Sequence, residues 1–331
     1  MKAIIPVAGA GTRLRPFTYT QPKALIPVAG KPILSYIIDE LLEANTKEFI
    51  FIVGYLGDKI QDFIKEKYPN IKATFVIQVQ REGLGHAVYL TKDFIEENEP
   101  IFIILGDSII DVNFKEVYNS GKSTLGYKKV DDPTKFGILE LDAEGKIKSL
   151  VEKPNIPKSN MALVGFYLIK ESKLLFECID KMIQSNHRTN GEYQLTDALM
   201  CMVNAGILFD CYKVENWFDM GKGNVLLQTN AQLLKKLGKV HLDAKIENSI
   251  IVEPVSIAAN AIIRNSIIGP DVTIGENSII ENSIIKDSII GNFTSLKDMT
   301  LKSSVIGSDA SMTGLSQKLN IGDNTEIDFS R

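Results

Sequence analysis

The first 240 residues alternate between short apolar runs and longer segments whose apolar side chains recur at helical spacing. The short runs, rich in β-branched residues, predict buried strands at residues 2–7, 49–53, 73–79 and 100–105. The spaced segments predict a first helix beginning at Pro32 and further helices at residues 58–68 and 85–94. Strands that are hydrophobic on both faces and alternate with helices indicate an open, Rossmann-like, mostly parallel sheet.

The pattern changes in the next hundred residues. Two alternating stretches around the turn at Asp142 predict a hairpin of residues 136–141 and 147–151. The remaining elements predicted are strands at 163–169 and 207–214, helices at 173–184 and 192–204, and a last helix ending near Gly238. The first domain is therefore expected to cover residues 1–238.

From residue 240 onward, aliphatic residues recur every five or six positions. The positions are Val240, Ile246, Ile251, Ile257, Ile263, Ile268, Ile274, Ile280, Ile285, Ile290, Leu296, Leu301, Ile306 and Met312. Ordinary hairpins would require alternating polarity, so this period predicts a parallel β-helix whose coils bury the aliphatic ladder. The second domain is expected to be residues 239–331, with residues 313–331 forming an end cap or a loose tail.

Composition adds limits to this picture. The 331 residues have a net charge of −4, which argues against an extended nucleic-acid surface. No apolar run is long enough for a membrane span, so no membrane partner is expected and the cytoplasm is the default location. The three cysteines, Cys178, Cys201 and Cys211, lack metal-type spacing and are expected to be buried thiols.

The first strand runs directly into a glycine-rich loop, Ala8-Gly9-Ala10-Gly11, which basic side chains follow. Glycines let backbone N–H groups approach an anion, and Arg13, Arg15 and Lys23 supply charge, so the loop predicts a phosphate site. A P-loop would need Gly-Lys-Ser/Thr before its helix and a dinucleotide fold would need a third glycine, and neither is present. The loop, Gln78 and Asp107 all follow strands and are expected to meet at one sheet edge.

The order of motifs along residues 1–237 resembles that of sugar-1-phosphate nucleotidylyltransferases, also called NDP-sugar pyrophosphorylases. The matching stretches are 9–16, 22–25, 28–32, 83–87, 105–107, 136–137, 151–154, 191–197 and 217–221. With the repeat, the chain looks most like long-form glucose-1-phosphate thymidylyltransferases, and it is also similar to UTP-glucose-1-phosphate uridylyltransferases. The resemblance implies the family's nucleotide-diphospho-sugar transferase fold, followed by a left-handed β-helix.

The resemblance also implies roles on the nucleotide side. Arg13 would contact the β- and γ-phosphates, and Lys23 would neutralise the transferred phosphate. Gln78 would read the base, with Gln80 as the rival, and Gly85 would leave room for that base. The nucleotide-binding set implied is Ala8, Gly9, Gly11, Thr12, Gln78, Gly83 and Gly85.

Two aspartates, Asp107 and Asp219, look like the carboxylates that hold Mg²⁺ in the family. Either aspartate alone is equally well explained as a turn or capping residue, so the metal assignment rests on the pair. The sugar-phosphate set implied is Gly137, Glu152, Lys153 and Gly165. Glu152 would accept hydrogen bonds from sugar hydroxyls, and Lys153 would bind the sugar phosphate.

The activity implied is Mg²⁺-dependent transfer of a nucleotidyl group from a pyrimidine triphosphate to a hexose 1-phosphate, glucose 1-phosphate being favoured. Ser108 replaces the asparagine usual in thymidylyltransferases, so dTTP is favoured only slightly over UTP. A β-helix acyltransferase lacks its histidine base, because no histidine occurs in residues 242–331. A non-catalytic paralogue would usually lose the charged set retained here. The β-helix is expected to serve homo-oligomer contacts or regulation.

Overall fold

The computed structural model describes residues 1–220, 223–238, 240–241 and 243–314. Two compact units are present, one from Met1 to Thr229 and one from Asn230 onward. The domain boundary predicted after residue 238 lies just beyond helix α7 (Gly223–Leu237) and stays a prediction. Gly221 of the 217–221 motif lies outside the described residues, as does most of the predicted cap or tail.

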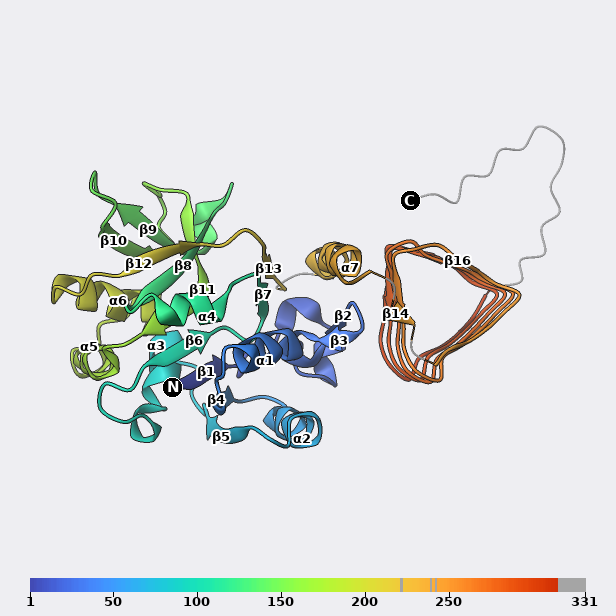
Figure 1. Cartoon of the computed structure of the whole chain (residues 1–331), viewed down its shortest axis with the longest axis horizontal. Coiled ribbons are helices and arrows are strands. Elements are labelled where there is room, and N and C mark those ends of the chain that lie inside the picture. The colour runs from blue at the N-terminus through green and yellow to red at the C-terminus, as the bar shows by residue number, and fades with distance from the viewer. Residues whose placement is uncertain (221–222, 239, 242, 315–331) are drawn as a thin grey trace. The chain divides into compact units, whose positions relative to one another are not determined.

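A nine-stranded mixed sheet forms the centre of the first unit (Figure 1). The strands of this unit are β1 (Lys2–Pro6), β2 (Pro27–Val28), β3 (Lys31–Pro32), β4 (Glu48–Val53), β5 (Lys72–Ile77), β6 (Ile101–Ile104), β7 (Ser108–Ile110), β8 (Thr124–Lys129), β9 (Gly137–Leu141), β10 (Ile147–Glu152), β11 (Met161–Ile169), β12 (Asp210–Lys213) and β13 (Trp217–Asp219). The sheet order is β10-β9-β11-β6-β1-β4-β5, and β8 pairs with both β11 and β12. Strands β6, β1, β4 and β5 are parallel neighbours, so their carboxyl ends share one edge. The predicted Rossmann-like sheet is confirmed.

Helices cover both faces of this sheet (Figure 1). They are α1 (Ile33–Glu43), α2 (Gly57–Lys67), α3 (Leu84–Tyr89), α4 (Phe114–Asn119), α5 (Ser172–Gln184) and α6 (Leu195–Asn204). Because side chains alternate across a strand, Ala3 and Ile5 of β1 enter the core shared with α1, α2 and α4. Ile4 enters the core shared with α3, α5 and α6. This two-sided burial explains the unbroken apolar runs.

The helix predicted at residues 192–204 begins later, at Leu195. Glu192, Tyr193 and Gln194 stay outside the helix, because the Tyr193 N–H donates to the Glu82 carbonyl at 2.7 Å and the Tyr193 carbonyl accepts from the Gly85 N–H at 2.8 Å. These bonds reach across about a hundred positions of sequence, and local spacing could not reveal them. The helix predicted at 85–94 is shorter as well, since α3 ends at Tyr89 and a 3₁₀ turn, Lys92–Phe94, follows.

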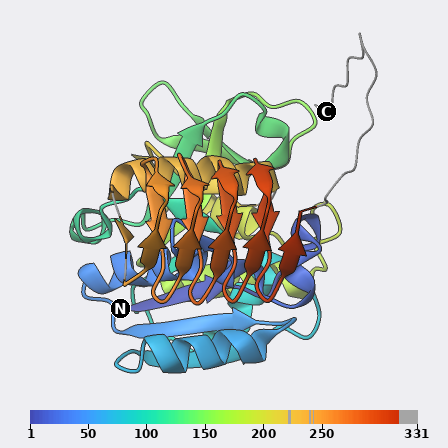
Figure 2. The same cartoon turned by 90° about the vertical axis from the view of Figure 1, so that its right-hand side faces the viewer.

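The second unit is a parallel β-helix with three faces, consistent with the predicted left-handed form (Figure 1). Figure 2 shows its coils side by side. Its strands are β14 (Val240–His241), β15 (Lys245–Glu247), β16 (Ile250–Ile251), β17 (Val255–Ile257), β18 (Ile262–Arg264), β19 (Ile267–Ile268), β20 (Val272–Ile274), β21 (Ile279–Glu281), β22 (Ile284–Lys286), β23 (Ser288–Ile290), β24 (Ser295–Lys297), β25 (Thr300–Lys302), β26 (Val305–Ile306) and β27 (Ser311–Thr313). Ile246, Ile263 and Ile280 stack in register, which confirms the predicted aliphatic ladder.

Several corners between the coils use asparagine. Asn248, Asn265 and Asn282 have φ values of 47°, 48° and 48°, the left-handed region that asparagine tolerates well. A serine follows each of them, and the Ser266 hydroxyl, for example, accepts from the Ser283 N–H of the next coil at 3.0 Å. The Asn-Ser pairs therefore turn the chain and bond successive coils.

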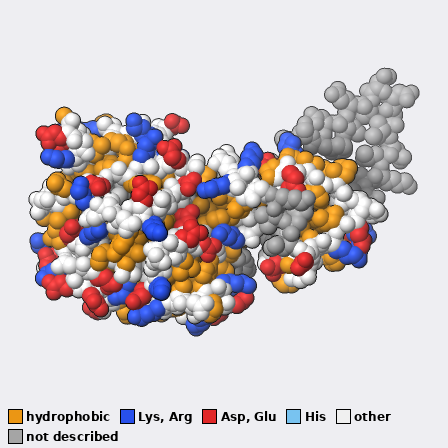
Figure 3. Space-filling model, in the orientation of Figure 1, with side chains coloured by type: hydrophobic (Ala, Val, Ile, Leu, Met, Phe, Trp, Pro, Cys, Tyr) orange, Lys and Arg blue, Asp and Glu red, His pale blue; other side chains and the backbone are white. Residues whose placement is uncertain are grey.

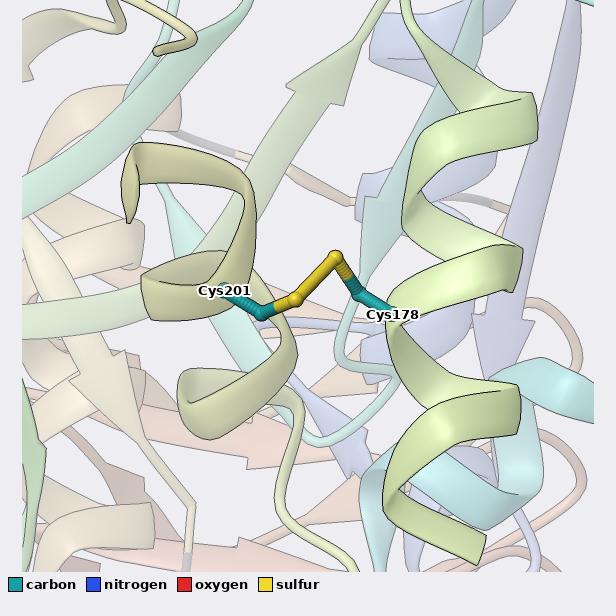
Figure 4. The surroundings of a disulfide bond; sticks show 2 residues. All are labelled: Cys178 and Cys201. Carbon is teal, nitrogen blue, oxygen red and sulfur yellow. A yellow bond between two sulfur atoms is a disulfide. The ribbon is translucent and has the colours of Figure 1, made fainter. Parts of the chain in front are cut away.

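The cysteine prediction is wrong for two residues. Cys178 of α5 and Cys201 of α6 form a disulfide between neighbouring helices (Figure 4). Cys211 is a free, half-buried thiol, and burial raises its pKa to about 11. No spacing in the sequence indicates the pairing, because the two helices come together only through packing on the same face of the sheet.

Loss of this disulfide is expected to destabilise the first unit. The bond closes a loop with a sequence separation of 23 residues, for which loop-closure entropy gives about 3 kcal/mol. Replacing both Cys178 and Cys201 by alanine should lower the melting temperature by about 6–12 °C for a domain of this size. Calorimetry with and without a thiol reductant measures the effect, and Cys211→Ala is the control. Equal melting temperatures for oxidised and reduced wild-type protein would contradict the expectation.

Candidate active site

The glycine loop begins at the carboxyl end of β1, and its residue Gly11 lies against Thr18 and Lys23. Gly11 has a φ of 59°, and its carbonyl accepts from the Thr18 hydroxyl at 2.9 Å. A Cβ on Gly11 would lie 2.8 Å from the Thr18 methyl carbon and 3.1 Å from Lys23 Cβ, so glycine permits the close return of the chain. Gly9 has no such neighbour within 4 Å and leaves an open approach to the loop backbone.

Lys23 and Asp107 form an ion pair across this loop. Lys23 Nζ lies 2.6 Å from Asp107 Oδ2, and the side chains are 12% and 44% exposed respectively. Asp107 reaches this place because it follows β6, the neighbour of β1, and the Gly106 N–H donates to the Pro6 carbonyl at 3.2 Å. The structure therefore brings together two residues predicted for one site from positions 84 apart.

Asp219 is placed beside this pair by a short two-stranded ladder. Strand β13 pairs antiparallel with β7, and Asp219 faces Ser108, the residue after Asp107. The Met220 N–H also donates to the Asp107 carbonyl at 3.2 Å. The described residues contain no cluster of three or more acidic, histidine or cysteine ligands. Two carboxylates nevertheless fit Mg²⁺, which is commonly held by one or two carboxylates together with substrate phosphates and water.

The Gln78 side chain turns toward the glycine turn that precedes α3. Gln78 follows β5, is half-buried, and its Nε2 donates to the Gly83 carbonyl at 3.3 Å. Gln80 is exposed, and its carbonyl accepts from the Glu82 N–H at 3.1 Å. Of the two candidates for reading the base, Gln78 is the one in contact with the predicted nucleotide-binding glycines.

Gly83 and Gly85 are fixed by close packing against Tyr193. Gly83 has a φ of 108°, and a Cβ there would lie 2.5 Å from the Tyr193 carbonyl oxygen. A Cβ on Gly85 would lie 2.8 Å from the same oxygen. The backbone of residues 192–194 therefore requires glycine here, a reason separate from the predicted need for room for a base.

Charged and aromatic side chains support this turn. Arg188 Nη2 donates to Glu82 Oε1 at 2.7 Å, and its guanidinium lies 4.1 Å from the centroid of the Tyr193 ring. The hydrogen bond from Arg188 lowers the pKa of Glu82, and the Glu82 carboxylate in turn raises the pKa of Arg188. His86 Nε2 is 3.5 Å from the second Glu82 oxygen. These contacts hold the turn and residue 193 together.

The hairpin of β9 and β10 brings two predicted sugar-binding residues face to face. Gly137 begins β9 and pairs with Glu152, which ends β10. Glu152 Oε2 accepts from the Thr196 hydroxyl at 2.7 Å, and Lys153 Nζ lies 3.4 Å from Glu152 Oε1. Thr196 was part of a recognised motif, but its partner could not be known from sequence.

The other predicted residues occupy less direct positions. Ala8 is buried, Thr12 and Arg13 are exposed in a 3₁₀ turn (Thr12–Leu14), and Arg13 makes no ion pair with a described residue. Gly165 of β11 packs on Leu105, its carbonyl accepting from the Leu105 N–H at 2.9 Å. A Cβ on Gly165 would lie 2.5 Å from Leu105 Cδ1. Gly165 therefore supports the turn that carries Asp107.

On the face shown in Figure 3, basic and acidic side chains of the first unit are interspersed among hydrophobic ones. Among the helices described, none combines the length and the apolar composition needed to cross a membrane.

Comparison with known families covers nearly the whole described chain. A family model described as "Nucleotidyl transferase" matches residues 2–236, and one described as "GlmU-like, C-terminal hexapeptide" matches residues 229–292. Every predicted site residue falls within the first match. The second match covers the first coils of the β-helix.

Individual relatives share about a third of the aligned residues. The low-salt glycan biosynthesis nucleotidyltransferase Agl11 of Haloferax volcanii is 35% identical over 76% of this chain and 72% of its own length. The bifunctional protein GlmU of Methanocaldococcus jannaschii is 36% identical, and the alignment spans 78% of this chain but only 61% of that protein. A solved UDP-glucose pyrophosphorylase complexed with UDP-glucose matches with a TM-score of 0.61 and 27% identity, covering 71% of this chain and 98% of that one.

Proposed function

Because the chain belongs to the nucleotidyl transferase family and is an enzyme that transfers nucleotidyl groups to sugar phosphates, we propose that its substrates are a pyrimidine nucleoside triphosphate and glucose 1-phosphate. The products are the NDP-sugar and pyrophosphate, and dTTP is slightly favoured over UTP. The strongest support is the contact between Lys23 and Asp107 across the glycine loop. It brings a cation for the phosphates and a carboxylate for a metal ion to one place.

The reaction needs positioned reactants more than a covalent nucleophile. An oxygen of the sugar phosphate attacks the α-phosphorus in line, and the bond from that phosphorus to the oxygen bridging to the β-phosphate breaks. Pyrophosphate leaves with the electron pair of that bond. In this proposal the loop backbone and Arg13 hold the β- and γ-phosphates, and Lys23 neutralises charge that develops on the transferred phosphate.

Asp107 and Asp219 are proposed as the protein ligands of a Mg²⁺ ion. When bound, Mg²⁺ supplies charge neutralisation at the phosphate oxygens. Lys23 pairs with Asp107 Oδ2 in this structure, so it also balances the carboxylate charge in the absence of the ion. Glu152 accepts from sugar hydroxyls, and Lys153 binds the sugar phosphate.

Gln78 is proposed to read the base edge. Its amide can pair with both a carbonyl and an imide N–H of a pyrimidine. The support is its position: Gln78 Nε2 lies 3.3 Å from the Gly83 carbonyl, at the turn that α3 follows. Thymine and uracil share this edge and differ by a methyl group, so the amide serves dTTP and UTP alike.

A substrate matrix tests the proposal. Pyrophosphate release is measured with each of the four triphosphates against glucose, galactose and N-acetylglucosamine 1-phosphates, with Mg²⁺ present. We expect turnover with dTTP or UTP and glucose 1-phosphate, and loss of turnover on adding EDTA with recovery on adding Mg²⁺. A purine triphosphate as the best donor would refute the assignment of Gln78, and turnover with no pair would refute the substrate proposal.

A second activity needs consideration because several relatives are described as bifunctional GlmU proteins. The alignments with this chain cover only 61% and 60% of the length of two of these relatives. Residues 242–331 contain no histidine to act as a general base in amine acylation. We propose a single activity for this chain, in domain 1–238, and transfer of an acetyl group from acetyl-CoA to an amino sugar phosphate would contradict it.

The β-helix is proposed to serve association of the chain into homo-oligomers. Ile250, Ile267 and Ile284 stack on one outer face and are 60%, 37% and 48% exposed, a row of apolar side chains facing solvent in the single chain. Light scattering gives the number of subunits. The enzyme is further proposed to act in the cytoplasm. Disulfides are rare in that compartment, so the Cys178–Cys201 bond of the structure should be reduced there. Thiol titration of protein from its own cell tests this location: three free thiols would support it, and a single free thiol would contradict it.

A further inference from the structure

Thr196 is an almost fully buried residue, 5% exposed, in the first turn of α6. A threonine at this position commonly bonds to the backbone of its own helix. Here its hydroxyl instead crosses to another element and donates to Glu152 Oε2 at the end of β10, at 2.7 Å. Such a hydroxyl orients the carboxylate that accepts its hydrogen bond.

Two further side chains, Lys153 and Tyr167, lie near the Glu152 carboxylate. Its side chain is only 11% exposed, and its other oxygen, Oε1, lies 3.4 Å from Lys153 Nζ. On the core side lies Tyr167, a phenol whose burial raises its pKa, with a further rise from the negative charge of Glu152. With Oε2 occupied by Thr196, Oε1 is the oxygen left to accept from a ligand hydroxyl.

Gly137 shows how closely this contact is packed. A Cβ on Gly137 would lie 2.9 Å from Thr196 Oγ1 and 3.0 Å from Glu152 Oε2. The first distance is shorter than real Cβ contacts and the second lies at their tight limit, so a larger residue would press on both partners of the bond. Gly137, Glu152 and Thr196 therefore form one unit that joins β9, β10 and α6.

We propose that Thr196 is the positioning residue of the sugar subsite: it holds the Glu152 carboxylate in the orientation that accepts hydroxyls of the hexose 1-phosphate. This inference rests on the proposed function. The residues just before Thr196 also hold the nucleotide-side turn, since the Tyr193 carbonyl accepts from the Gly85 N–H at 2.8 Å. The short segment 193–196 thus fixes one element of each substrate subsite.

Thr196→Val removes the hydroxyl and keeps the shape of the side chain. Because a hydrogen bond to a charged group is lost, the KM for glucose 1-phosphate should rise about tenfold. The KM for the triphosphate and the melting temperature should change little, and Thr196→Ser should restore the sugar-phosphate KM to within about twofold of the wild-type value. Thr91→Val is the matched control, because Thr91 is also buried and its hydroxyl donates to the Val88 carbonyl at 2.7 Å.

A double-mutant cycle separates positioning from direct contact with the sugar. Once Glu152→Ala has removed the carboxylate, adding Thr196→Val should have no further effect on the sugar-phosphate KM. If the two effects instead add fully, Thr196 acts on its own and the inference is wrong. An unchanged KM in Thr196→Val, or equal rises for both substrates, would also overturn it. These results require an active wild-type enzyme, whereas an inactive wild type refutes the proposed substrates first.

Discussion

Asparagine in place of Asp219 or of Asp107 is expected to lower kcat by at least about a thousandfold while the chain stays folded. The two carboxylates lie on adjoining positions, since Asp219 faces Ser108 in the ladder of β13 and β7. Asparagine keeps the shape of aspartate but replaces one acceptor oxygen with an NH₂ donor and removes the charge. The loss should therefore fall on metal-dependent charge neutralisation and not on packing.

The measurement is kcat at saturating Mg²⁺, together with the melting temperature of each variant. Asp210→Asn is the matched control, because Asp210 Oδ1 also pairs with a lysine, Lys122, at 3.1 Å. That pair is exposed, so its loss should change stability by less than about 1 kcal/mol and leave kcat intact. Full activity in either Asp107→Asn or Asp219→Asn would refute the metal assignment.

Spacing alone was sufficient for much of the fold. The β-branched runs of β1, β4 and β6 could be recognised because strands buried on both faces need apolar residues at every position. The β-helix could be recognised because its inner ladder repeats every coil, as with Ile257, Ile274 and Ile290. In both cases the burial that stabilises the element is imposed on consecutive or regularly spaced residues.

The parts that could not be predicted depend on contacts between distant segments. Glu192 to Gln194 leave the helical conformation because Tyr193 bonds to Glu82 and Gly85. The disulfide exists because α5 and α6 share one core cluster. Strands β7 and β13 are three residues each, too short to give a periodic signal, yet they place Asp219 beside Asp107.

The candidate site shows the same division. Basic residues after a glycine loop were enough to propose Lys23 for a phosphate site, whereas the metal, sugar and base roles of Asp107, Glu152 and Gln78 came from the resemblance to the nucleotidylyltransferases. The residues that hold those side chains in place were not predicted in that role. Thr196 supports Glu152 through a single hydrogen bond, and Gly106 brings Asp107 to β1 through its backbone N–H. Supporting contacts of this kind can be identified only from the folded structure.

Lys23→Met is expected to change turnover and metal binding in opposite directions. Methionine keeps most of the apolar stem of lysine but removes the ammonium group that lies 2.6 Å from Asp107 Oδ2. Without that charge, the transferred phosphate loses electrostatic stabilisation, and kcat should fall by about 10²–10³. In the free enzyme Asp107 loses a competing cation, so a divalent ion should bind about tenfold more tightly, since one unit charge at such range is worth roughly 1–4 kcal/mol.

Binding of Mn²⁺ to the nucleotide-free protein, followed by electron paramagnetic resonance, measures the second effect, and steady-state kinetics measures the first. Lys122→Met provides the control, because it breaks the exposed pair with Asp210 and should leave both quantities at wild-type values. If Lys23 were only a structural anchor, its removal would lower the melting temperature and weaken activity and Mn²⁺ binding together. Tighter Mn²⁺ binding with lower kcat is the combination that follows from a lysine shared between Asp107 and the transferred phosphate.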